Sequence, residues 1–347
     1  MNYEDAFAYA VARVRVLENR MIDSARFNRM LEAADLEEFA KILAETEYAQ
    51  SGRPDPRRYE EMIDEGLGRA YDTVGGFSPV PYLTGVFRAQ HDFHNLKVHL
   101  KASQLPQAAP RGFSPVGWLG RDEIRVVSDL RAGAEIEDAD FPVERDRAIL
   151  QDALRQAGEQ AIAAYRAAGQ DPQYIDMVVD RATFDYYQGV ARLYKAAFLE
   201  ELIAALADLT NIRIYMRLRA IGKPSGFFLS AAVPHGSIDT GAMAEFFGEP
   251  VDRFASALSR SAYAKVVSEG VDEWQKTGSL RRLEALADAA IAERVRETRY
   301  LADGYEPVLG YLMARENEAS TLRRICVGKV NDLPPDTIRE RLCEGYA

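Results

Sequence analysis

The stretches DFHNLKVHLK (residues 92–101) and DLTNIRIYMR (residues 208–217) decide the fold of this chain. Each begins with an acid, places an asparagine three residues later, and continues with basic residues five and nine positions after the acid. Between these polar positions, apolar side chains recur at steps of three and four, which is the spacing of one buried helix face. The two stretches therefore predict two related helices.

Other motifs repeat at a similar distance along the chain. A weaker third copy of the helix starts at Glu318, and two further pairs of motifs match: Pro115, Gly117 and Leu119 with Pro234, Gly236 and Ile238, and Phe39 and Tyr48 with Phe254 and Tyr263. All spacings agree on a period of about 110–120 residues, which is the signal of an internal repeat. We expect three similar helical-bundle domains, covering residues 1–112, 113–230 and 231–347. The proline-rich stretches 102–117 and 221–236 are interpreted as linkers.

Helical patterns dominate the rest of the chain. Residues 7–21 carry one apolar stripe, Asp35 followed by Glu38 resembles a capping box, and Pro250 fits the first turn of a helix. Residues 187–219 predict either one long helix or two shorter ones. Strand signals are short and scarce, so the predicted fold class is all-α.

Composition excludes several classes of protein. Acidic residues number 54 and basic residues 43, and the net charge of −11 disfavours nucleic-acid binding. The two cysteines, Cys326 and Cys343, are too few for a disulfide scaffold or a four-cysteine zinc site. No apolar run approaches the ~18–20 residues of a membrane span, and the charged N-terminus predicts no export signal.

Catalytic motifs are missing from the sequence. The pairs Gly222–Lys223 and Gly328–Lys329 lack both the earlier glycine and the following Ser or Thr of a phosphate-binding loop. Hydrolase motifs are absent too, and we expect neither a cofactor nor catalysis by this chain. One alternative remains, because His91, Asp92 and His94 would together suit an α-helical metalloenzyme.

Basic residues recur at one place in each unit, namely Lys97 and Lys101, Arg213 and Arg217, and Arg323. Cations near the C-terminal end of a helix stabilise its dipole by about 0.3–1 kcal/mol each, which is one explanation. The other is a ring of positive charge that docks an acidic partner. The asparagines and acids of the same helices are expected to cap or cross-link helices.

These patterns together resemble a known family. The segments AFAYAVARVRVLENRMI (residues 6–22), the two asparagine helices, and ENEASTLRRICVGKVNDLPPDTIRERL (residues 316–342) look like parts of the C subunit of the V/A-type ATP synthases, a relative of the d subunit of the eukaryotic V-ATPase. The resemblance covers essentially the whole chain. The last segment is the most specific, because a glycine, a lysine and a Pro-Pro helix start occur in fixed order.

The resemblance implies a fold and a role. The fold would be a pseudo-threefold funnel of three all-α domains with a central cavity. The role would be that of a non-catalytic part of the central stalk that couples the proteolipid rotor ring to the D and F subunits of the shaft, so that ion translocation drives ATP synthesis or the reverse. The protein would be peripheral, on the cytoplasmic face of the cell membrane, and would touch the membrane only through the ring. An unrelated helical scaffold that binds another acidic protein is the remaining alternative.

Overall fold

The computed structural model describes residues 3–49, 58–104, 112–129, 142–339 and 342. Within these ranges every regular element is a helix, which confirms the predicted all-α class. The chain divides into two compact units, and each is described by itself. Unit 1 comprises residues 1–88, 114–118 and 292–347, and unit 2 comprises residues 89–113 and 119–291. The three-repeat boundaries stay a prediction.

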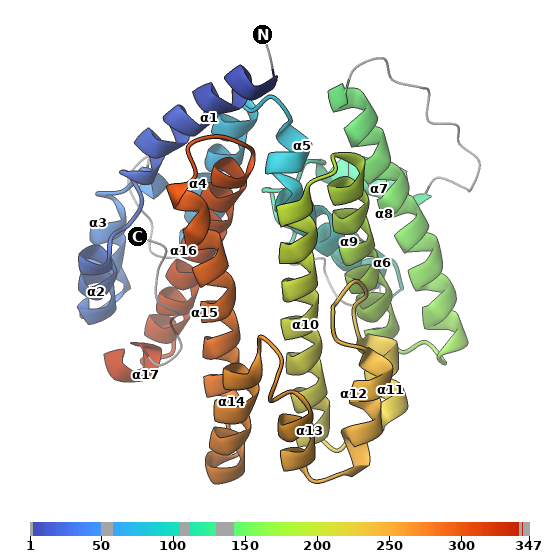
Figure 1. Ribbon diagram of the computed structural model, residues 1–347. Helices are drawn as coiled ribbons and strands as arrows, with labels where there is room; N and C mark the ends of the chain where they lie inside the picture. The colour runs from blue at the N-terminus through green and yellow to red at the C-terminus, as the bar shows by residue number, and fades with distance from the viewer. Residues whose placement is uncertain (1–2, 50–57, 105–111, 130–141, 340–341, 343–347) are drawn as a thin grey trace. The chain divides into compact units, whose positions relative to one another are not determined.

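Unit 1 is assembled from both ends of the chain. Its long helix α16 (Glu306–Val330), drawn in red and orange in Figure 1, packs against α4 (Tyr59–Gly75) and α1 (Tyr3–Glu18). The predicted stripe of α1 is buried, as expected, through Phe7, Ala10, Val11 and Val14. The shorter elements are α2 (Ser24–Glu32), α3 (Leu36–Leu43), η1 (Glu47–Ala49), α5 (Pro81–Thr84), η3 (Val86–Arg88), η5 (Thr298–Tyr300) and α17 (Pro335–Arg339).

Unit 2 is organised around α9 (Gln173–Leu193), which contacts α6 (Ala89–Gln104), α8 (Pro142–Ala167) and α10 (Ala197–Ala220). Figure 1 shows α8, α9 and α10 as long neighbouring helices. The other elements are α7 (Arg121–Asp129), α11 (Ser225–Ala231), α12 (Thr240–Glu245), η4 (Phe246–Gly248), α13 (Val251–Ala257), α14 (Ala264–Thr277) and α15 (Arg281–Glu297). Residues 292–297 of α15 belong to unit 1.

An aromatic cluster fixes the short helices of unit 2 to α10. The buried ring of Tyr215 stacks on Phe254 of α13 with centroids 3.9 Å apart, and it meets the edge of Phe228 of α11 at 5.5 Å. Such pairs add about 0.5–1.5 kcal/mol beyond the area they bury. The helix predicted after Pro250 is present as α13, and the stretch 221–236, interpreted as a linker, contains α11. Residues 105–111 of the other predicted linker lie outside the described residues, as does Cys343.

The stretch 187–219 forms two helices. The chain leaves α9 at Tyr194, and Lys195 adopts a left-handed conformation with φ of 52°. The Ala196 amide then donates to the Ala191 carbonyl at 2.8 Å, which closes the helix end as a Schellman-type turn. A lysine in the left-handed conformation costs about 1–2 kcal/mol, and glycine is the residue usually found there. Because this turn contains neither glycine nor proline, the sequence carries no signal that would have predicted it.

The predicted capping box at the start of α3 is present. The Asp35 carboxylate accepts from the Glu38 amide at 2.8 Å, and the Glu38 carboxylate accepts from the Ala34 amide at 2.7 Å. Two amides at the helix start are therefore satisfied by side chains.

Candidate interaction site

The three aligned helices α6, α10 and α16 hold a buried acid at the same repeat position. In each case the carboxylate accepts a hydrogen bond from the backbone amide of a loop in the same unit. A buried amide left unpaired would cost about 1–3 kcal/mol, so these acids fix the loops to the helices. The pairs are Asp92 with Leu119 (2.8 Å), Asp208 with Ile238 (2.9 Å) and Glu318 with Ile22 (3.2 Å).

The asparagine of α10 strengthens the same attachment. The Asn211 side-chain oxygen accepts from the Val233 amide at 2.8 Å, and its nitrogen donates to the Val233 carbonyl at 3.0 Å. Both hydrogen-bonding groups of this residue are thereby paired away from water. Asp208 and Asn211 therefore attach α10 to the loop between α11 and α12, whereas the sequence predicted that they cap or cross-link helices.

All five basic residues predicted to dock a partner lie in ion pairs within the chain. Each reaches across to an acid on another helix of its own unit. The pairs are Lys97 with Asp180 (2.7 Å), Lys101 with Asp176 (2.6 Å), Arg213 with Asp288, Arg217 with Glu284 (2.6 Å) and Arg323 with Asp64. We call this set the ion-pair ladder.

The ladder follows one rule. Counted along the sequence, an acid helix (α4, α9 or α15) precedes each basic helix (α6, α10 or α16). Each basic helix pairs with the acid helix of the following repeat: α6 with α9, and α10 with α15. The last basic helix, α16, pairs with the first acid helix, α4. The buried acids follow the same order, because Asp92, Asp208 and Glu318 bond to the loops before α7, α12 and α2.

One position of the ladder is empty. Val327 of α16 occupies the place of Lys101 and Arg217, and its side chain is exposed. The matching acid is retained as Glu60, four residues before Asp64. Burial raises the pKa of the Cys326 thiol to about 12, and the nearby negative charge of Glu60 raises it in the same direction. Glu60 therefore lies near Cys326, the residue before Val327, and the ladder cation that the repeat pattern would match to it is replaced by Val327.

The ladder adds an explanation for the basic residues that the sequence did not offer. The Arg213 side chain is 25% exposed and contacts both the Asp288 carboxylate and the Glu284 carbonyl. It therefore joins α10 to α15 and does not only stabilise the dipole of its own helix. Ion pairs of this exposure contribute about 0.2–1 kcal/mol each. The sequence signal that would have found them is the matching pair of acids four residues apart on α9 and α15, which faces the basic pair four residues apart. A role for the five residues in partner docking stays a prediction.

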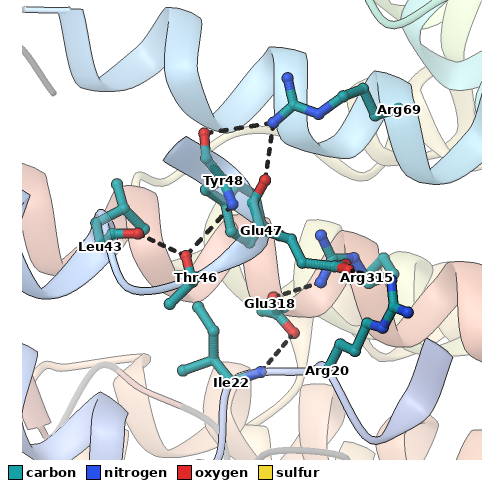
Figure 2. Close-up of polar contacts among 9 residues, drawn as sticks. All are labelled: Arg20, Ile22, Leu43, Thr46, Glu47, Tyr48, Arg69, Arg315 and Glu318. Atoms are coloured by element: carbon teal, nitrogen blue, oxygen red, sulfur yellow. Dashed lines mark hydrogen bonds and ion pairs between the residues drawn. The ribbon is translucent and has the colours of Figure 1, made fainter. Parts of the chain in front are cut away.

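Sequence reasoning missed a buried ion pair in unit 1. Arg315 donates to Glu318 at 2.8 Å, and both side chains are 2% exposed. Figure 2 shows that Glu318 also accepts from the Ile22 amide. The Arg315 guanidinium lies over the ring of Tyr48 at 4.7 Å, and burial raises the pKa of the Tyr48 phenol well above its usual range. An arginine inside an apolar helix pattern was the only available signal, and such residues are seldom fully buried.

One histidine of the suggested metal cluster, His94, and His235 elsewhere in the chain both have polar contacts of their own. His94 Nε2 lies 2.7 Å from the Gly112 carbonyl, and His235 Nε2 lies 2.7 Å from the Asp185 carboxylate. In the described ranges, no group of three or more His, Cys, Asp or Glu side chains is placed to hold a metal ion. Among the same residues, no helix has the length and apolar character needed to cross a membrane.

The fold and the ladder define a class: an all-helical protein in which similar helices are joined by recurring ion pairs. The chain belongs to the family of ATP synthase (C/AC39) subunits, whose model matches residues 10–341.

Curated relatives agree with this assignment. The C subunit of the A-type ATP synthase of Methanocaldococcus jannaschii is 22% identical over 354 residues, covering 97% of this chain and 86% of the relative. The C subunit of the V-type sodium ATPase of Enterococcus hirae is 23% identical over 337 residues, covering 96% of this chain and 97% of the relative. The resemblance to this family that the sequence indicated is confirmed.

Proposed function

We propose that the protein is a non-catalytic part of the central stalk that couples the membrane rotor ring to the central shaft of a V/A-type ATP synthase. The observation that carries this proposal is the family match, which spans nearly the whole chain. In this role the protein would bind the proteolipid ring on one side and the D and F subunits of the shaft on the other. It would lie peripherally on the cytoplasmic face of the membrane.

The ion-pair ladder supports the threefold arrangement that this role requires. Linkage of each repeat to the next, and of the last to the first, is the order expected if the repeats surround a common axis. A funnel with a central cavity would then receive the shaft. Helices packed side by side are stiff because their cores are densely packed, which suits a part that transmits torque.

Two experiments test the coupling role. The purified chain is mixed with a shaft subcomplex and, separately, with ring-containing membranes, and binding to both is expected at micromolar concentration. Deletion of the protein should abolish ATP-driven ion pumping while the ATPase activity of the catalytic head remains. Failure to bind either partner, or normal pumping after deletion, would refute the proposal.

The predicted docking residues need a variant that keeps the fold and the net charge. Lys101→Gln with Asp176→Asn removes one ladder pair without leaving a lone charge behind. If Lys101 docks a partner, shaft or ring binding weakens while helix content and unfolding midpoint stay near wild type. Unchanged binding would leave the residue with its role in the ladder alone.

A further inference from the structure

The ladder raises a problem of pairing. Two of its basic helices, α6 and α10, present two cations four residues apart, α16 presents only Arg323 of that pair, and each of the three acid helices carries two acids four residues apart. The single ladder cation of α16 matches an acid on each of the three acid helices, so this charge by itself does not fix the place of α16. In chains with similar repeats, one helix can take the place of another, either within one molecule or between two copies by domain swapping.

Besides the missing ladder cation, one buried feature separates α16 from its sister helices. At the repeat position of Arg315, α6 carries Ala89 and α10 carries Ala205, and both alanines are buried. At the position of Glu318 both sister helices carry a shorter aspartate. The Arg315–Glu318 pair is thus confined to the helix that binds the N-terminal segment.

The surroundings of this pair come from segments far away in the sequence. Glu318 accepts the amide of Ile22, and Tyr48 lies over Arg315. Glu47 lies nearby and is itself paired with Arg20 at 3.2 Å, while Arg69 of α4 donates to the Glu47 carbonyl at 2.9 Å (Figure 2). Charge and shape are therefore matched only where η1 and the segment after α1 come together.

We infer that the buried Arg315–Glu318 pair is a registry device that selects α16, and excludes α6 and α10, for the place against the N-terminal helices. A buried ion pair adds little net stability, but burying either charge without its partner is strongly unfavourable. If α16 docked elsewhere, both charges would lose Ile22 and Tyr48. If α6 or α10 took its place, an alanine would face the space that the arginine fills.

The test uses refolding of the full chain, with Cys326 as a reporter. This thiol is fully buried when α16 is docked. In a Cys343→Ser background, the chain is unfolded in urea, refolded, and pulsed with a thiol reagent. In parallel, size-exclusion chromatography with light scattering measures the fraction of domain-swapped dimers, in which α16 has docked onto another copy of the chain.

The test variant is Arg315→Met with Glu318→Gln, which removes the charges and keeps approximate shape. Its matched control is Arg323→Met with Asp64→Asn, which removes a ladder pair between α16 and α4. We expect the labelled fraction of Cys326 and the dimer fraction to rise several-fold in the test variant, with helix content retained. The control should refold as wild type does.

Wild-type protection of Cys326 in the test variant, or equal labelling in the control, would overturn the inference. If the test variant is recovered only as aggregate, Arg315→Lys decides the matter. Lysine keeps the charge but lacks the planar fork that spans Glu318 and the Tyr48 ring. A smaller rise in labelling is then expected, and labelling equal to wild type would overturn the inference.

Discussion

Restoring the empty ladder position should stabilise unit 1. Val327→Arg places a guanidinium opposite Glu60, as Arg217 lies opposite Glu284 on α10 and α15. Val327 is 45% exposed, so its replacement uncovers little apolar surface. The change therefore adds an ion pair at small cost in packing.

The size of the effect follows from the sister pair. The Arg217 and Glu284 side chains are 59% and 39% exposed, and pairs of this exposure contribute about 0.2–1 kcal/mol. For a chain of 347 residues that corresponds to a rise in melting temperature of about 0.3–1.4 °C. The coupling should shrink in 1 M NaCl, where the Debye length is about 3 Å.

A double-mutant cycle isolates the new pair. It compares Val327→Arg, Glu60→Gln and their combination by thermal unfolding in low and high salt. Val327→Gln controls for the better helix propensity of an unbranched side chain. A coupling energy of zero, or equal gains from Val327→Gln and Val327→Arg, would refute the assignment of Val327 and Glu60 to the ladder.

Three further predictions concern packing, charge and the buried thiol. Gly66→Ala drives a methyl group into the ring of Tyr48 in η1 and should lower the free energy of unfolding in urea by about 1–3 kcal/mol. Gly68 has open space around it, so Gly68→Ala should raise the free energy of unfolding by about 0.5–1 kcal/mol. Equal effects of the two substitutions would contradict the packing described. Arg213→Glu should destabilise unit 2 by about 1–3 kcal/mol in the same assay, and adding Asp288→Arg should recover most of the loss unless the two side chains do not interact. Because folding raises the pKa of the Cys326 thiol from 9.0 to about 12, its contribution to stability is complete below pH 9 and is lost as the pH rises toward 12. Cys326→Val should therefore show a smaller loss of stability over that range, and an identical pH profile would show that the thiol is not buried as described.

The sequence predicted the elements better than their partners. The all-α class, the buried stripe of α1 and the capping box at Asp35 follow from local spacing, which a single sequence carries. The end of α9 at Tyr194 was left open because Lys195, without glycine or proline nearby, takes the left-handed conformation.

The candidate site shows the same division. The position in the repeat singled out Arg213 and its counterparts. The acids that pair with them lie tens to hundreds of residues away, and no local sequence pattern identifies these acids as their partners. Arg315 escaped notice because its burial depends on Tyr48 and Glu318 together. Charge partners of this kind become visible only when helices distant in sequence are brought into contact.

Unit 1 is built from segments far apart in the sequence, and this affects its folding during synthesis on the ribosome. The unit needs residues 1–88 together with residues 292–347, so the first helices emerge about 200 residues before α16. At about 5–20 residues per second, that interval lasts roughly 10–40 s. Throughout it, the apolar faces of α1 and α4 lack the helix that covers them, so the nascent chain presents a target for chaperones until α16 has been made.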